Sequence, residues 1–323
     1  MTASPAPRPL AAPASGPVRG GPFDLADDDA YRRWRDHKLA GYPADVGDLV
    51  VEVADLAALT PAEHGALLAR LRKTNMAVYA ARRGGGEDKA VHRGVAARFG
   101  LARLDNNLCA DDDGITPLRV IQDGRRVRYI PYTDRPIKWH TDGYYNTPDM
   151  WIRAMVLHCV RPAAEGGVNA LLDHELAYIA LRDRDPALVA ALMHPMAMTI
   201  PPNDEGDNRI RGARTNPVFA VDAATGALLM NFSERKRNLV WRDDADTARA
   251  VAALADILHG DTPGIFRHRL AAGQGLVCNN VLHDRSGFAD SDDGPGRLLF
   301  RGRYADRVAG TALSDTWPEE DRR

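Results

Sequence analysis

The sequence has few cysteines, almost no net charge and no long apolar run, and each absence excludes a class of protein. The three cysteines form no C-x-x-C pair, so we expect reduced thiols and a cytoplasmic location, not a disulfide framework. The net charge of −2 favours neither nucleic acid nor an anionic membrane as a partner. The apolar stretches are far shorter than the roughly 20 residues that cross a bilayer, and the N-terminus lacks the apolar core of a secretion signal.

Two common catalytic motifs are also missing. The glycine run Gly84–Gly86 is not followed by the Gly-Lys-Ser/Thr of a phosphate-binding loop, so we expect a turn there. No H-E-x-x-H motif is present, which argues against a hydrolytic zinc site. Residues 1–22 are rich in Ala, Pro, Gly and Ser and are predicted to form a disordered tail. Residues 23–323 are predicted to form one domain.

Short strand-like runs separated by Gly, Pro and Asp dominate the middle of the chain. A capping box, Thr60–Glu63, begins a helix between two of these runs. Pro186 is expected to split the helical run Asp173–Leu192. Further helices are expected at Glu87–Phe99 and Asp244–His259. The expected strands are Val50–Val53, Asn75–Ala80, Leu118–Gln122, Arg126–Ile130, Ile137–Tyr144, Met150–Val160, Asn169–Leu172, Val218–Asp222, Leu228–Phe232, Phe266–Leu270, Gly275–Asn279 and Leu298–Tyr304. Strands with inserted helices and no regular βαβ repetition predict an α+β fold around a β-sandwich or jelly roll.

The segment Ile137–Tyr145 contains the pattern H-x-D, at His140 and Asp142. Its β-branched and aromatic residues favour a strand or the end of one. Alternate side chains of a strand share a face, so the imidazole and the carboxylate would project into one space. His283 follows the apolar run Gly275–Asn279, where a third ligand could reach back toward them. Two histidines and one carboxylate form the facial triad that suits non-haem Fe(II) and O2 chemistry.

A basic strand lies near the C-terminus. Strand alternation places Arg297, Leu299, Arg301 and Arg303 on one face. Inside a barrel these guanidinium groups need anions, and their planar fork suits a carboxylate. The alternative is an exposed basic strand, or one that forms salt bridges to the acidic turn Asp290–Asp293.

The ordered set of His140-Thr-Asp142, Gly166–Asp173, His283 and Arg297 resembles the TauD/TfdA-like Fe(II)/2-oxoglutarate dioxygenase superfamily. The resemblance covers about Val50 to Arg307. That family has H-x-D, a distant His and then an Arg; here the last spacing is 14 residues (297 − 283). The motif H-x-R-x-x-F at His283–Phe288 looks like the γ-butyrobetaine hydroxylase branch, although this chain has no cysteine-rich zinc module like that branch.

The resemblance implies a distorted double-stranded β-helix, a jelly-roll relative, with flanking and inserted helices. It also implies an enzyme that uses Fe(II), 2-oxoglutarate and O2 to oxidise a C–H bond of a small molecule. The implied iron ligands are His140, Asp142 and His283. The implied partner of the C5 carboxylate of 2-oxoglutarate is Arg297, helped by Asn169, and Arg301 falls where some relatives bind a substrate anion. Because halogenases of this superfamily lack the carboxylate, Asp142 implies hydroxylation or a related oxidation.

The sequence does not identify the substrate. Tyr144 and Tyr145, near Trp139 and Trp151, fit either a substrate-binding cage for a cation or packing in the core. The segment Phe232–Trp241 fits either an anion site or an exposed turn.

The polar segment Pro201–Arg214 is long for a connection and is expected to be a mobile loop, either a lid over the substrate or a solvated basic loop. Two alternatives to the oxygenase stay open. One is a cupin-type metal enzyme that uses O2 without 2-oxoglutarate, and the other is a binding or sensor protein on the same scaffold. Whether the chain forms a homo-oligomer is also left open.

Overall fold

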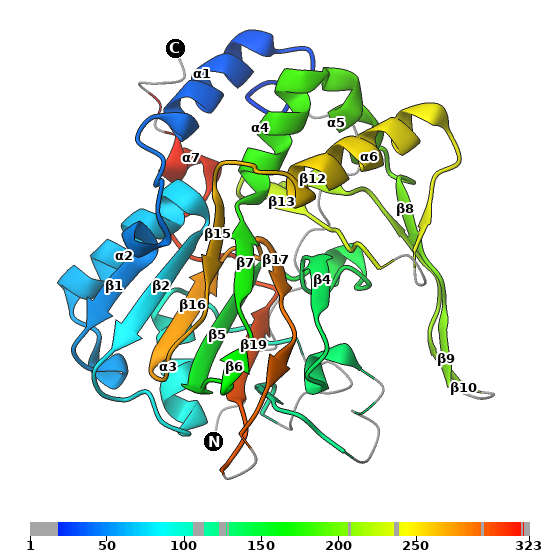
Figure 1. The fold of residues 1–323 in the computed structure, drawn as a ribbon. Coiled ribbons are helices and arrows are strands. Elements are labelled where there is room, and N and C mark those ends of the chain that lie inside the picture. Colours follow the sequence, from blue (N-terminus) through cyan, green and yellow to red (C-terminus); the bar gives the residue numbers. More distant parts are fainter. Residues whose placement is uncertain are drawn as a thin grey trace, which may run out of the picture.

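Two β-sheets packed face to face form the centre of the molecule (Figure 1). The computed structural model describes residues 19–105, 113–122, 127, 129–205, 208–235, 239–291, 294–317 and 319. The larger sheet has the strand order β1 (Val50–Val53), β2 (Met76–Ala81), β16 (Gln274–Cys278), β5 (Ala154–Arg161), β19 (Leu298–Tyr304) and β3 (Thr116–Leu118). The smaller sheet has the order β15 (Ile265–His268), β7 (Asn169–Leu172), β17 (Leu282–Arg285) and β4 (Ile137–His140).

Apolar side chains from both sheets meet between them. Leu157 and Leu276 of the larger sheet share one buried cluster with Leu171 and Phe266 of the smaller sheet. Apart from the parallel pair β1 and β2, the paired strands of both sheets are antiparallel. The predicted α+β fold around a two-sheet, jelly-roll core is therefore confirmed.

Two helices, α2 (Pro61–Thr74) and α3 (Lys89–Arg98), cover the outer face of the larger sheet. The capping box of α2 forms as predicted, because the backbone N–H of Glu63 donates to Thr60 Oγ1 and the N–H of Thr60 donates to Glu63 Oε2. Leu71 of α2 and Val95 of α3 are buried in a cluster with Tyr79 of the sheet. This apolar contact holds the two helices on the sheet.

Four helices gather at one end of the two sheets, at the top of Figure 1: α1 (Asp28–Leu39), α4 (His174–Arg184), α5 (Pro186–Met193) and α6 (Ala245–His259). They share a buried cluster with the antiparallel pair β12 (Phe219–Val221) and β13 (Leu228–Met230). Asp185 ends α4 and accepts a hydrogen bond from the N–H of Ala187 in α5. The predicted break at Pro186 is thus confirmed. A short helix, α7 (Leu313–Thr316), lies near the C-terminal end.

The remaining strands are short. One sheet has the order β11 (Arg214–Asn216), β8 (Met198–Ile200) and β14 (Val240–Trp241), and two further pairs are β9 (Asn203–Glu205) with β10 (Asn208–Arg211) and β6 (Glu165–Gly166) with β18 (Phe288–Ala289). The ribbon of β9 and β10 extends away from the rest of the molecule (Figure 1).

Several local expectations were wrong. The loop expected at Pro201–Arg214 contains the paired strands β9 and β10, because polar residues can pair along the backbone without an apolar face. The strand expected at Leu118–Gln122 is instead β3, which ends at Leu118, and the strand expected to reach Tyr144 ends at His140.

Other expectations lie outside the described residues. They concern most of the tail 1–22. The strand expected at Arg126–Ile130 was wrong, because its described residues Val127 and Tyr129 are not in a strand and Ile130 begins a 3-10 helix, Ile130–Tyr132. The tail and the single domain 23–323 stay predictions. Among the described residues, no helix is long and apolar enough to cross a membrane.

Candidate metal centre

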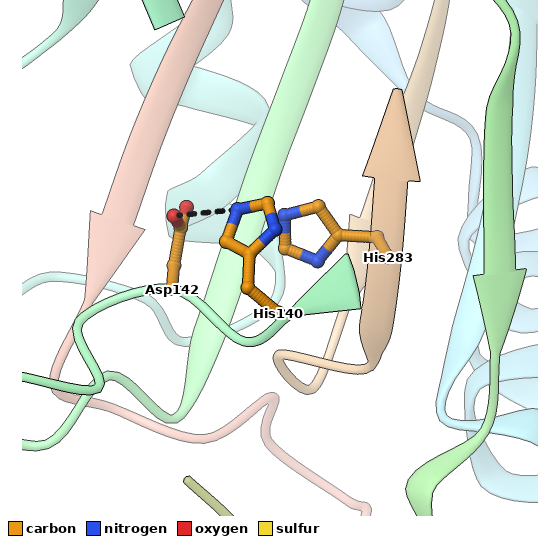
Figure 2. A group of neighbouring side chains, drawn as sticks. All are labelled: His140, Asp142 and His283. Atoms are coloured by element: carbon orange, nitrogen blue, oxygen red, sulfur yellow. Dashed lines mark ion pairs between the residues drawn. The ribbon is translucent and has the colours of Figure 1, made fainter. Parts of the chain in front are cut away.

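Two imidazoles and one carboxylate converge at the end of β4 (Figure 2). The antiparallel register of β4 and β17 pairs His140 with His283, and their ring centroids are 4.2 Å apart. Asp142 follows β4, and its Oδ1 lies 3.8 Å from His140 Nε2. One ligand atom from each of the three side chains lies within 4.8 Å of the others. The structure thus brings together the three residues that the sequence suggested as metal ligands.

Asp142 reaches this position through a turn and not through strand alternation, which corrects the geometry expected from the sequence. Gly143 has φ +69°, a conformation that side chains other than glycine adopt at a cost. A Cβ at this position would also lie 2.4 Å from Ile152 Cγ1. Glycine therefore permits the tight turn that directly follows Asp142 and packs against Ile152.

Backbone carbonyls orient both histidines. Nδ1 of His140 lies 2.9 Å from the carbonyl oxygen of Lys138, and Nδ1 of His283 lies 2.9 Å from that of Val281. A neutral ring that donates from Nδ1 leaves Nε2 as a free acceptor. Burial, reinforced by the nearby His283, lowers the pKa of His140 to about 3. His140 is therefore neutral at ordinary pH, as a metal ligand must be.

Asp142 offers a charged oxygen that has no partner among the described residues. Its Oδ1 lies 3.2 Å from Nη1 of Arg301, while its buried Oδ2 accepts no hydrogen bond. Burial opposes ionisation, but the guanidinium groups of Arg301 and Arg303 outweigh it and hold the pKa of Asp142 below its ordinary value. A buried carboxylate oxygen beside two free imidazole nitrogens fits a divalent cation, and this donor set suits Fe(II).

Asn280 fixes the backbone of Asp142, a role that the sequence did not reveal. Its Oδ1 accepts from the N–H of Asp142 at 2.8 Å, and its Nδ2 donates to the carbonyls of Asp142 at 3.0 Å and Ile152 at 2.8 Å. Asn280 has a positive φ of 51°, which asparagine tolerates better than most residues. The only signal in the sequence was an asparagine pair shortly before His283.

Arg297 and Asn169 line one small cavity near β6 and β18. The Arg297 side chain is 4% exposed, and its Cζ lies 4.9 Å from the ring centroid of Phe288. Its Nη1 has no hydrogen-bond partner among the described residues, and burial lowers its pKa. Asn169 donates from Nδ2 to the carbonyl of Asp284. An unpaired buried guanidinium needs an anion, so the site fits a carboxylate from a cosubstrate.

The alternative, in which Arg297 pairs with the acidic turn Asp290–Asp293, can be compared with the contacts of Asp290. Asp290 accepts a hydrogen bond from the backbone N–H of Arg297, and no ion pair joins their side chains. Asp292 and Asp293 lie outside the described residues. Arg301 and Arg303 are buried as well, so this strand is not the exposed basic strand of the alternative.

Arg285 is a second buried cation beside Arg297, and no role was predicted for it from the sequence. Its Cζ lies 4.8 Å from the centroid of the Phe288 ring. The guanidinium groups of Arg285 and Arg297 therefore both lie close to this ring. Arg285 donates to the carbonyls of Thr133 and Arg135 in the loop before β4. Burial and the positive charge of Arg297 lower its pKa to about 9. The motif H-x-R-x-x-F contained this residue, but only the fold shows its neighbours.

A cavity of about 550 Å³ opens beside His140 and Asp142. Tyr144 and Tyr145 line it, with ring centroids 5.2 Å apart, as do Arg301 and Arg303. Tyr144 and Tyr145 also pack in one apolar cluster with Trp139, whereas Trp151 lies in another cluster. Neither tryptophan lines the cavity, so the four aromatics do not form one cage. The other cationic residues of the lining are Arg135, Lys138 and Arg235, and Asp142 is the only acidic residue among the described lining residues.

The chain matches known proteins over most of its length. A family model described as "Taurine catabolism dioxygenase TauD, TfdA family" matches residues 50–303. A relative from Amycolatopsis sp, named uridine-5'-phosphate dioxygenase, is 32% identical over 177 residues, which are 52% of this chain and 60% of the relative. A relative of the same name from Streptomyces sp is 28% identical over 203 residues, which are 60% of this chain and 70% of the relative. The first match therefore spans less than two thirds of that relative.

Solved structures share the fold. One is an asparagine oxygenase in complex with Fe(II), 2S,3S-3-hydroxyasparagine and succinate, with a TM-score of 0.53 and 14% sequence identity. The alignment covers 92% of this chain and 96% of that one. At this identity the likeness concerns the fold alone.

Proposed function

The chain belongs to the taurine catabolism dioxygenase TauD, TfdA family, and from this premise we propose that it is an Fe(II)- and 2-oxoglutarate-dependent oxygenase. The observation that carries the proposal is the convergence of His140, Asp142 and His283, each with one ligand atom free to face the others. In this proposal the three side chains hold Fe(II). Arg297 holds the distal carboxylate of 2-oxoglutarate, with Asn169 beside it.

Bound Fe(II) and 2-oxoglutarate would supply the activation of O2, with succinate and CO2 as coproducts, for oxidation of a substrate C–H bond. The residues of this chain would bind the metal and the cosubstrate and keep the metal ligands oriented. The carbonyls of Lys138 and Val281 fix the two imidazoles, and Asn280 fixes the backbone of Asp142. Because Asp142 is present, the proposed outcome is hydroxylation or a related oxidation.

The two alternatives account for less of the site. A cupin-type enzyme without 2-oxoglutarate would leave Arg297 buried with an unpaired charge, which is costly. A binding or sensor protein would not need a carboxylate oxygen held buried and unpaired next to two oriented imidazoles.

We further propose an anionic small molecule as the substrate. The cavity beside the proposed iron ligands has five cationic lining residues and one acidic one among those described. Two relatives are named uridine-5'-phosphate dioxygenase, so uridine 5'-phosphate is the first compound to test. Tyr144 and Tyr145 provide aromatic surface in the same cavity.

The experiment is an anaerobic titration with Fe(II) and 2-oxoglutarate, followed through the visible metal-to-ligand charge-transfer band. The wild-type protein should develop the band, His283→Ala should lose it, and Arg297→Ala should require far more 2-oxoglutarate. Arg242→Ala, which changes an exposed arginine that does not line the cavity, is the matched control and should behave as wild type. No band in the wild type would remove the proposal, and a band that survives His283→Ala would refute the assigned ligands.

A further inference from the structure

The cavity beside His140 and Asp142 has some cationic residues that pair with acidic side chains and others that do not. Arg301 pairs with Asp142, and Arg303 pairs with Asp105 and donates to the hydroxyl of Tyr145. Among the described residues, no acidic side chain pairs with the other three cations of the lining, Arg135, Lys138 and Arg235. The unbalanced positive charge therefore lies on the side of the cavity formed by β4 and the segment after β13.

The backbone brings two of these cations opposite each other. His140 forms an antiparallel bridge with Ser233, flanked by hydrogen bonds from the N–H of Thr141 to the carbonyl of Phe232 and from the N–H of Glu234 to that of Trp139. Continued by two residues, this register would place Lys138 opposite Arg235, and both residues line the cavity. Both belong to the face that carries His140, because side chains two residues apart share a face.

The acidic neighbour of Arg235 does not balance its charge. Glu234 lies on the opposite face, where its carboxylate contacts His259 at the end of α6. Glu234 and His259 line a second groove, which Lys138 also borders, but no ion pair joins Glu234 to Lys138. Like charges placed opposite each other across two strands destabilise the pair, and a bound dianion would reverse the sign of that interaction.

We propose that Lys138 and Arg235 form the subsite for a phosphate monoester group of the substrate. This inference rests on the proposed oxygenase function and adds the position at which the substrate is held. A phosphate accepts charge-assisted hydrogen bonds from both side chains, the lysine acting as a point charge and the arginine as a fork. The subsite differs from the one that the family resemblance implied, because Arg301 already balances Asp142.

The subsite lies two residues from a proposed iron ligand on the same strand. Side chains at positions 138 and 140 are about 7 Å apart along a strand, a separation set by a rise of about 3.3 Å per residue. A phosphorylated compound held at Lys138 and Arg235 would thus place its nearest carbon atoms beside the iron. The subsite orients the substrate as well as selecting it.

Calorimetric titration of the protein loaded with Fe(II) and 2-oxoglutarate without O2 tests the proposal, with uridine 5'-phosphate and uridine as the two probes. Lys138→Gln and Arg235→Gln should each raise the Kd for uridine 5'-phosphate about tenfold, and the double variant should raise it further. The Kd for uridine should change less than twofold, because uridine has no phosphate. Arg242→Gln is the matched control and should bind both probes as wild type does.

Four results would overturn the proposal. The first is a wild type that binds uridine 5'-phosphate no more tightly than uridine, and the second is an unchanged Kd for uridine 5'-phosphate in the double variant. The third is a double variant that binds both probes more weakly by the same factor. The fourth is a larger loss of phosphate selectivity in Arg301→Gln than in the double variant. Failure of the oxygenase function is a separate result. It would appear as a missing charge-transfer band. The ratio of the Kd values for uridine 5'-phosphate and uridine would still test whether Lys138 and Arg235 bind the phosphate.

Discussion

At the residue scale, the carboxylate ligand depends on one asparagine. Asn280 contributes both its donor and its acceptor to the chain around Asp142, and it does so from a left-handed backbone conformation. Buried groups that hydrogen-bond to a metal ligand keep it in position, and a small displacement of the ligand lowers the affinity for the metal.

Replacing Asn280 by glycine should therefore weaken iron binding. The variant keeps the left-handed conformation but loses three buried hydrogen bonds, so the free energy of unfolding should fall by about 2–3 kcal/mol. The Fe(II) concentration at half-saturation, measured anaerobically through the charge-transfer band, should rise about 10- to 100-fold.

Asn75→Gly is the matched control for that variant. Asn75 is also left-handed and buried, and its side chain bonds to Asp173, Asn279 and Arg307 but not to Asp142. This control should lose stability while retaining its iron affinity. Unchanged iron binding in Asn280→Gly would show that Asp142 does not need this support.

At the scale of elements, helix α3 places a histidine where protonation is unfavourable. His92 of α3 is buried near His158 and Phe300 of the larger sheet, and neither ring nitrogen has a partner among the described residues. Burial, with the neighbouring His158 and the positive charges of Lys89 and Arg93, lowers the pKa of His92 to about 3. The unfolded chain, with a pKa of about 6.5, binds a proton that the folded chain does not bind.

Acid should therefore destabilise the protein through His92. The folded-state pKa is depressed, so stability is greatest above pH 6.5 and is lost as the pH falls toward 3. From pH 7.5 to pH 5 this residue should cost about 2 kcal/mol. His92→Met should remove that loss, so urea unfolding at the two pH values should show a shallower decline than in wild type. The other buried histidines are present in both proteins, and parallel pH profiles would contradict the prediction.

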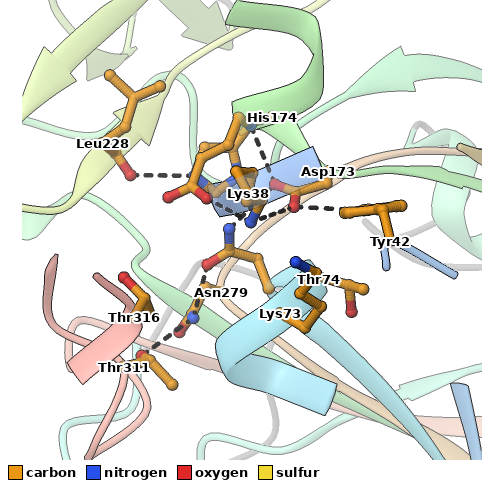
Figure 3. A network of polar contacts seen from close by, with 12 residues as sticks. Lys38, Tyr42, Lys73, Thr74, Asp173, His174, Leu228, Asn279, Thr311 and Thr316 are labelled. Carbon is orange, nitrogen blue, oxygen red and sulfur yellow. Dashed lines mark hydrogen bonds and ion pairs between the residues drawn. The ribbon is translucent and has the colours of Figure 1, made fainter. Parts of the chain in front are cut away.

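At the scale of the whole molecule, a buried charge network ties α1 to α4 and α2 (Figure 3). Lys38 of α1 contacts the carboxylates of Asp173 and Glu175, and Asp173 Oδ1 accepts from Asn75. Burial alone would lower the pKa of Lys38, but the two carboxylates outweigh it and raise that pKa. The network links the N-terminal helix, the start of α4 and the end of α2.

Lys38→Met should therefore destabilise the molecule strongly. The variant leaves two buried carboxylates without their cation, which should lower the free energy of unfolding by about 3–5 kcal/mol in urea denaturation at pH 7. Arg32→Met is the matched control on the same helix. Its exposed pair with Asp29 should contribute under about 1 kcal/mol. Similar losses in the two variants would contradict a structural role for the network.

Much of the fold could be predicted because its signals are local. The capping box Thr60–Glu63, the break at Pro186 and the strand Leu298–Tyr304 each depend on residues close to one another in the chain. The strand expected to reach Tyr144 failed for a nonlocal reason, since the turn at Gly143 packs against Ile152. A cytoplasmic location and a homo-oligomer stay predictions.

The sequence by itself determined the chemistry of the candidate site, because H-x-D, a distant histidine and a following arginine specify donor types and their order. Only the tertiary structure decided which partners these groups have. Asn280 contacts Asp142 across 138 residues of sequence, and Arg301 does so across 159. Such contacts follow from the way distant turns and strands pack together, which no local pattern specifies. The meeting of Lys138 and Arg235 at one cavity, on which the proposed phosphate subsite rests, is likewise a long-range property of the fold.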